Sequence, residues 1–144
     1  MHKIMKFLQV PTKEKNIYIR VLLLSALYRV IIIIIPFKKL SKHMGEYNKV
    51  SNYNPSQEEI HYISKISRII SKVCFNTPWE SKCLVQALIG QKFLSKNKIE
   101  STLYLGVSKD SRKELIAHAW LKCGEYYVTG NNGVTFGIVA KYLK

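Results

Sequence analysis

The spacing of the apolar residues changes from a helical to an alternating period near Ile99, and this change most constrains the fold. Before it, residues 56–59 fit a capping box, in which a Ser hydroxyl and a Glu carboxylate each bond a free backbone N–H at a helix start. The apolar residues that follow lie on one helical face: Ile60, Ile63, Ile66, Ile69, Ile70 and Val73. The pattern predicts a helix from about 57 to 73.

A second helix is predicted directly afterwards, with two alternatives for its first residue. Residues 77–80 form another capping box, with proline in the favoured first helical position. Alternatively, Ser81 is the N-cap. The helix continues to about Ser95 in either case, and the choice decides whether Cys83 lies in its second or its first turn.

Beyond Ile99 the sequence predicts strands. They cover residues 102–107, 115–122 and 126–129, and a looser alternation over 134–143 predicts a last one. A tight turn at 123–125 joins the second and third strands as a hairpin. Helices followed by hairpin-linked strands indicate an α+β fold with an antiparallel sheet.

The most hydrophobic segment precedes this domain. It runs from Ile17 to Ile35, is interrupted by Arg20 and Arg29, and is stopped by Pro36. A spanning helix needs about 20 apolar residues with few or no charges, so we expect a buried or interfacial helix instead. It is expected to pack on the following domain or on a partner protein, with peripheral membrane contact through residues 17–36 as the second possibility.

Two regions are therefore expected. Residues 1–50 would form the N-terminal hydrophobic, basic helix and a linker, and residues 51–144 the main domain. The chain has 23 Lys and Arg against 9 Asp and Glu, for a formal net charge of +14. Residues 1–50 hold ten of the basic and two of the acidic residues, which favours an acidic partner or a membrane surface. No known nucleic-acid-binding pattern occurs, so no nucleic-acid partner is expected.

The three cysteines, Cys74, Cys83 and Cys123, fit no disulfide framework and include no C-x-x-C pair. We therefore expect reduced thiols in a cytoplasmic protein, with no structural metal and no cofactor. Cys74 and Cys123 are expected to be structural.

Cys83 and His118 are the candidate catalytic residues. Cys83 opens or nearly opens a helix, whose N-terminus stabilises a thiolate and offers free N–H groups to an oxyanion. His118 lies in a predicted strand and is the only histidine after Cys83. This order suits a thiol nucleophile with its general base.

A third group should orient the imidazole. The only aspartate, Asp110, precedes His118. Opposed residues of a hairpin share a face, so a turn at Gly124-Glu125 places Asn131 opposite His118, and a turn one residue earlier places Thr129 there. We favour Asn131, with Thr129 second; a backbone carbonyl or water is a further alternative.

The two tryptophans are expected mainly in the core. Trp79 and Trp120 could otherwise line the active-site cleft as substrate-binding residues.

Several blocks of the sequence resemble a known family. Residues 78–87 (PWESKCLVQA) are similar to the nucleophile motif of the lasso-peptide leader peptidases, which are small transglutaminase-like cysteine proteases. Residues 102–107 look like the first strand of that family, and 117–121 with Gly124 look like its histidine strand. Residues 129–130 resemble the close of the hairpin, and 36–40 resemble the N-terminal region.

The resemblance implies a transglutaminase-like or papain-like core with Cys83 and His118 at its centre. It implies removal of the leader from a ribosomally made lasso-peptide precursor, before a separate ATP-dependent cyclase closes the macrolactam. The leader would be held by a separate recognition protein. Some members carry Asp as the third catalytic residue, and this sequence departs from them there. The alternative is a non-catalytic adaptor that docks precursor peptide and cyclase.

Overall fold

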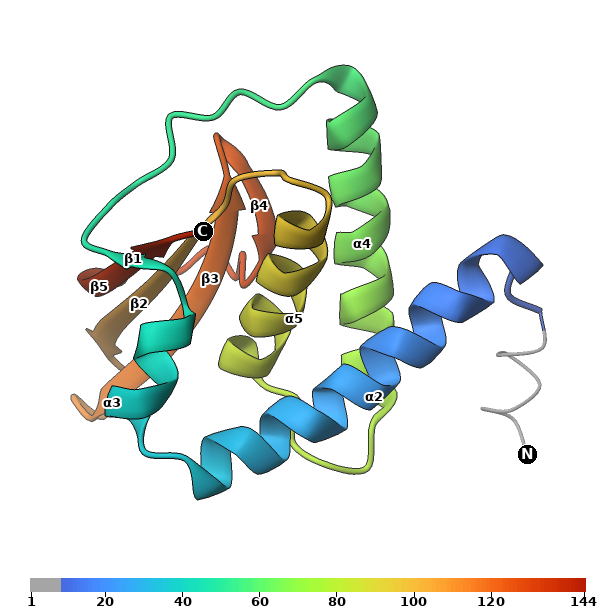
Figure 1. Cartoon of the computed structure of the whole chain (residues 1–144). Coiled ribbons are helices and arrows are strands. Elements are labelled where there is room, and N and C mark those ends of the chain that lie inside the picture. Colours follow the sequence, from blue (N-terminus) through green and yellow to red (C-terminus); the bar gives the residue numbers. More distant parts are fainter. Residues whose placement is uncertain (1–8) are drawn as a thin grey trace.

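A layer of helices covers one face of a five-stranded antiparallel sheet (Figure 1). The computed structural model describes residues 9–144, and residues 1–8, the start of the predicted N-terminal region, lie outside them. The main helices are α2 (Thr12–Ile34), α4 (Gln57–Asn76) and α5 (Cys83–Lys96). The predicted α+β class is confirmed.

Helix α4 begins as the sequence predicts. The Ser56 hydroxyl accepts from the Glu59 N–H at 3.3 Å, and the Glu59 carboxylate accepts from the Ser56 N–H at 2.8 Å. Both halves of the capping box are therefore formed. The helix continues three residues beyond the predicted end.

Helix α5 begins at Cys83, and neither predicted N-cap is used. The N-cap is Lys82, which makes no side-chain capping bond. The Thr77 hydroxyl instead lies 2.9 Å from the Ser81 hydroxyl and within bonding distance of the carbonyl oxygens of Cys74 and Trp79, so the two candidate caps bond each other. This loop keeps residues 77–82 out of the helix and places Cys83 at its first position.

The sheet has the order β1-β5-β2-β3-β4, with all neighbours antiparallel. Its strands are β1 (Glu46–Tyr47), β2 (Thr102–Lys109), β3 (Leu115–Cys123), β4 (Tyr126–Thr129) and β5 (Gly137–Leu143). The last strand starts three residues later than predicted and inserts between β1 and β2. The segment expected to be a linker thus adds an edge strand to the sheet.

Helix α2 ends just before Pro36, as predicted, and packs against α4 and α5. It buries Tyr18, Val21 and Ser25 in these contacts. Two short helical segments, α3 (Phe37–Leu40) and η1 (Ser41–His43), lead from it to β1.

Helix α5 is the centre of the molecule because both of its sides are buried. Ala87, Leu88 and Leu94 join the cluster that includes Leu103, Ala119, Leu121 and Val128 of the sheet. Val85, Ile89 and Phe93 join a second cluster with Val21 of α2 and Ile66, Ile69 and Ile70 of α4. This sandwich fixes the start of α5, and with it Cys83, relative to the sheet.

Candidate active site

Cys83 lies at an uncapped helix N-terminus. It is half-buried and packs against the cluster between α5 and the sheet. The first intrahelical bond runs from the Gln86 N–H to the Lys82 carbonyl at 3.1 Å, and no side chain caps the turn before it. The N–H groups of this first turn therefore point out of the helix end, where they favour a thiolate or a developing oxyanion.

The other two cysteines differ in their surroundings. Cys74 and Cys123 are buried, and burial raises the pKa of each thiol to about 11. Both are therefore held as thiols at neutral pH. Cys83 is the one of the three cysteines that is not buried.

His118 has a fixed ring orientation. It lies in β3 opposite Gly106 of β2, and its ring stacks on Phe136 with centroids 4.8 Å apart. Its Nε2 lies 2.7 Å from the carbonyl oxygen of Gly130. A carbonyl only accepts, so Nε2 carries the proton and donates, which leaves Nδ1 of the neutral ring as a proton acceptor.

The partner of this imidazole nitrogen is thus the backbone carbonyl of Gly130, the further alternative, and neither Asn131 nor Thr129. No hydrogen bond joins His118 to either of those side chains within residues 9–144. Gly130 has φ +80°, and a Cβ there would lie 2.6 Å from the Ala119 carbonyl oxygen. Only glycine fits this close approach to β3. The signal in the sequence was the glycine directly after the predicted third strand.

A β-bulge explains why the predicted partner was not reached. The turn is Gly124-Glu125, with Cys123 opposite Tyr126, as in the favoured alternative. The register then shifts between Leu121 and Lys122. Counting residues from the turn assumes a regular ladder and therefore does not predict this bulge.

Thr129 pairs with Leu121 and turns toward the helices. An ideal Cβ on Gly90 of α5 would lie 3.5 Å from the Thr129 methyl group. Its hydroxyl is buried, and no hydrogen-bond partner for it exists in the described part of the chain. The Thr129 side chain therefore belongs to the contact between β4 and α5.

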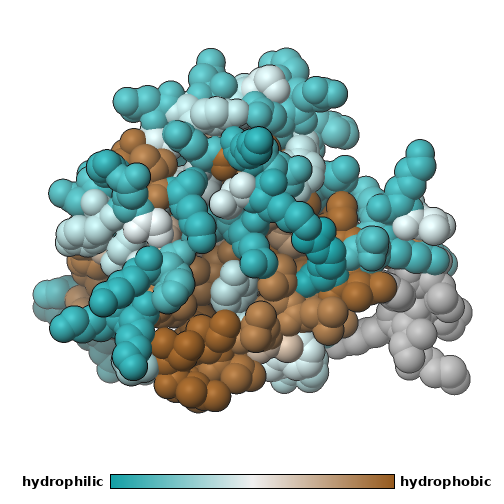
Figure 2. Space-filling model, in the orientation of Figure 1, coloured by the Kyte–Doolittle hydropathy of each residue, from teal (hydrophilic) through white to brown (hydrophobic). Residues whose placement is uncertain are grey.

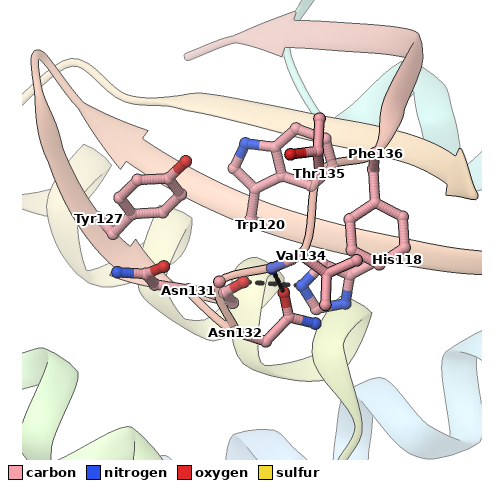
Figure 3. Close-up of a pocket in the computed structure, with 10 residues that line it drawn as sticks. His118, Trp120, Tyr127, Asn131, Asn132, Val134, Thr135 and Phe136 are labelled. Atoms are coloured by element: carbon pink, nitrogen blue, oxygen red, sulfur yellow. Dashed lines mark hydrogen bonds between the residues drawn. The ribbon is translucent and has the colours of Figure 1, made fainter.

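A cavity of about 290 Å³ opens beside His118 (Figure 3). Its wall is formed by Trp120 and by the segment that follows β4, including Asn131, Asn132, Val134, Thr135 and Phe136. A neighbouring cavity of similar size is lined by Gln86, one turn into α5, and shares Gly130, Asn131 and Asn132 with the first. The segment 130–132 therefore lies between His118 and the beginning of α5.

The backbones of Cys83 and His118 lie toward the same end of the molecule, but the imidazole is on the face of the sheet away from α5. Helix α5 and strand β3 run in the same direction (Figure 1), and the side chain of Leu121 packs beside Gly90. Following both backbones back from this contact leads to Cys83 and to the Ala117–His118 end of β3. The side chains of Ala119 and Leu121 pack on the α5 side, whereas the His118 ring stacks with Trp120 on the other face of the sheet. Among the described residues, no hydrogen bond connects the Cys83 thiol with the imidazole.

Helix α2 holds the loop that precedes Cys83. The Trp79 indole N–H donates to the Ser25 hydroxyl at 3.1 Å, and Glu80 pairs with Arg29 at 3.0 Å. The Trp79 side chain therefore links this loop to α2. Trp120 is buried, stacks on Tyr104 at 5.4 Å between centroids, and contributes to the cavity beside His118.

Residues 9–144 contain no group of three or more His, Cys, Asp or Glu side chains that could hold a metal ion. The arrangement offers a thiol at a helix N-terminus and an oriented imidazole, which are the groups that nucleophilic acyl chemistry requires.

Comparison with known proteins supplies the family. No curated protein and no solved structure matches the chain significantly. The family model of the transglutaminase-like superfamily, which includes cysteine peptidases, matches residues 32–140, from the end of α2 into β5. This range contains both Cys83 and His118 and covers more than half of the chain, and the chain therefore belongs to the transglutaminase-like superfamily.

Proposed function

We propose that this protein is a cysteine peptidase that removes the leader from a lasso-peptide precursor, with Cys83 as nucleophile and His118 as general base. The observation that carries the proposal is a cysteine at an uncapped helix start, in a chain that also holds a histidine whose Nε2 is already bonded to Gly130. The resemblance of the Cys83 and His118 segments to the leader peptidases supports the substrate class.

The first step is activation of the thiol. With Nε2 donating to Gly130, Nδ1 of His118 is the nitrogen that accepts the Cys83 proton. Catalytic contacts often form only in the substrate complex. Here the step requires the imidazole, which stacks with Trp120 on the sheet face away from α5, to come within reach of the Cys83 thiol.

The thiolate then attacks the carbonyl carbon of the leader–core bond. The N–H groups of the first turn of α5 stabilise the tetrahedral oxyanion. His118 returns the proton to the leaving amine of the core peptide, and a leader thioester remains on Cys83. Water, deprotonated by His118, hydrolyses the thioester and frees the leader acid and the thiol.

The partners in this proposal follow from the resemblance. The precursor would be presented by a separate leader-recognition protein, and the freed core amine would pass to the ATP-dependent cyclase. Asn131 and Asn132 line both cavities and would bond the peptide backbone near the cut. Trp120 would contact side chains of the precursor from the cavity wall.

The test uses a precursor encoded beside the gene, incubated with the leader-recognition protein and this protein. Mass spectrometry reads the products for the wild type, Cys83→Ala and Cys74→Ala. Cys74 is the matched control, since it is a buried cysteine near the end of α4. Thermal unfolding verifies that both variants are folded.

The proposal expects one leader-sized fragment with the wild type and with Cys74→Ala, and none with Cys83→Ala. Cleavage that survives in folded Cys83→Ala contradicts the peptidase mechanism. Loss of peptide maturation only when residues 1–40 are changed, with Cys83→Ala fully active in maturation, would favour the adaptor.

A further inference from the structure

The outer face of α2 is apolar along its whole C-terminal part. The side chains on this face are Ile19, Leu22, Leu23, Leu27, Val30, Ile33 and Ile34, all exposed. Leu23 is 64 % exposed, Ile33 65 % and Ile34 71 %. Residues 19 to 34 extend over about 22 Å at 1.5 Å per residue. Figure 2 shows this face as a brown band along α2, broadest near the C-terminal end of the helix.

The two arginines within this segment do not interrupt the face. The Arg20 guanidinium lies 5.1 Å from the centroid of the Phe93 ring of α5, and Arg29 pairs with Glu80 at 3.0 Å. Both charges are turned toward the body of the protein. The exposed side therefore carries no charge between Ile19 and Ile34, although the sequence places two arginines there.

We propose that α2 docks this protein on an anionic lipid surface, with the helix lying in the plane of the interface. Basic residues flank the apolar face. Lys13 lies in the first turn of α2, and Lys38, Lys39 and Lys42 follow the end of this helix. All four are exposed. An apolar helical face beside exposed lysines is typical of peripheral proteins that bind anionic membranes. The proposal does not depend on the peptidase activity.

The composition of the face favours lipid over a protein partner. Protein interfaces concentrate their binding energy in Trp, Tyr and Arg. The seven exposed residues here are aliphatic, and the nearest exposed aromatic residue is Phe37, between the face and the two lysines. Such a smooth aliphatic surface fits acyl chains better than the pockets of a protein.

The helix lies along the membrane and does not cross it. Among the described helices, α2 alone is long and apolar enough to span a bilayer. Its inner side, however, is buried on α4 and α5 through Tyr18, Val21 and Ser25. Spanning would remove these contacts, together with the bonds of Ser25 and Arg29 to the loop before Cys83.

The test is co-sedimentation of the full chain with vesicles. One set contains phosphatidylcholine alone, and the other contains phosphatidylcholine with phosphatidylglycerol. The face variant is Leu23→Gln with Ile34→Gln, which adds no charge. The matched control is Val50→Gln with Tyr126→Gln, which replaces two exposed apolar residues outside α2. Thermal unfolding compares the stability of all three proteins.

We expect binding to the anionic vesicles that weakens at high salt, and much weaker binding to the neutral ones. The face variant should bind about tenfold or more weakly, because two large aliphatic groups no longer enter the acyl boundary, and the control should bind as the wild type does. Absence of binding to anionic vesicles, or equal binding by the face variant, overturns the proposal. A dimer in sedimentation velocity that the face variant abolishes also overturns it, since a second copy would then cover the face.

Discussion

The three cysteines of the chain lie in different environments. Cys74 and Cys123 are buried with pKa values raised to about 11, whereas Cys83 is half-buried at the start of α5. The sequence predicted this division from the position of each cysteine relative to the helices. A backbone carbonyl was the further alternative for the partner of His118, but the sequence did not identify Gly130, because nothing in it marks the β-bulge that shifts the pairing.

Selective alkylation follows from this difference. Iodoacetamide at pH 7.5 should label Cys83 in the folded protein and leave Cys74 and Cys123 unlabelled, because the buried thiols are protonated and inaccessible. Peptide mapping by mass spectrometry identifies the modified residue. Labelling in denaturant should reach all three. Modification of Cys74 or Cys123 in the native protein as fast as Cys83 contradicts this account.

Because Gly130 lies close to β3, a side chain at this position is expected to destabilise the protein and to disturb His118. Gly130→Ala should lower the free energy of unfolding by about 1–3 kcal/mol, since a Cβ there overlaps Ala119 and the φ is positive. It should also lower kcat more than it raises KM, because the orientation of His118 is lost.

Gly133→Ala is the control for that prediction. Gly133 also has a positive φ, +72°, but a Cβ there would meet nothing within 4 Å. It should show the backbone strain without the loss of kcat. Equal effects of the two substitutions on kcat, measured on the precursor, would show that the contact of Gly130 has no part in positioning His118.

At the scale of elements, the sequence predicts best where a local motif sets the boundary. Helix α4 begins at its capping box, and the strands begin or end within a few residues of the predicted positions. Helix α5 begins later than predicted because Thr77 and Ser81 bond each other, and Trp79 bonds α2. The Trp79–Ser25 bond joins residues that are distant in sequence, so no local pattern reveals it, and the Thr77–Ser81 bond uses up both candidate caps locally.

The hydrogen bond between α2 and the loop before Cys83 can be removed by a single substitution. Ser25→Ala deletes the acceptor of the Trp79 indole N–H and should lower the free energy of unfolding by about 1–3 kcal/mol. Cleavage should slow in parallel, since the loop positions Cys83. Ser41→Ala, at a hydroxyl that is bonded to Lys38 near the surface, should change neither property. Urea denaturation and precursor cleavage measure the two effects.

The start of α4 is predicted to respond to pH. The Tyr53 hydroxyl donates to Glu59 at 2.6 Å; this bond lowers the pKa of the Glu59 carboxyl and raises the pKa of Tyr53 to about 12. The lowered pKa contributes stability at neutral pH that is lost as pH falls through the folded value of Glu59. The raised pKa contributes stability that is lost as pH rises through about 12.

Tyr53→Phe tests this assignment by urea denaturation across pH. The stability difference between wild type and variant should be largest near neutrality and should shrink below about pH 4, where Glu59 is protonated in the unfolded chain. A difference that stays constant between pH 3 and pH 7 contradicts the proposed role of the Glu59 bond.

At the scale of the whole molecule, the fold class was predictable and the sheet order was not. The change of period near Ile99 indicated helices followed by strands. The insertion of β5 between β1 and β2 joins segments about 95 residues apart, such as Glu46 and Leu143, and no local pattern encodes it. The inner contacts of α2 were expected, but the turning of Arg20 and Arg29 toward the body became visible only in three dimensions.

The packing of α2 predicts the result of removing it. Deletion of residues 1–35 should expose Ile66, Ile69 and Ile70 of α4 and abolish the cooperative thermal transition, because these side chains are fully buried in a cluster that α2 completes. Calorimetry of the truncated and full chains measures this. A transition of unchanged midpoint and enthalpy in the truncated chain would show that α2 is dispensable for the fold.

The claim that Cys83 carries the acyl group is tested most directly by trapping the intermediate. Full-length protein, recognition protein and precursor are mixed, quenched in acid within the first turnover and measured by intact mass. The account predicts an adduct equal to the leader acid minus one water, which maps to Cys83, is released by hydroxylamine and is absent in Cys83→Ala. Leader release by the wild type without any adduct, together with unchanged cleavage by Cys83→Ala, would contradict it.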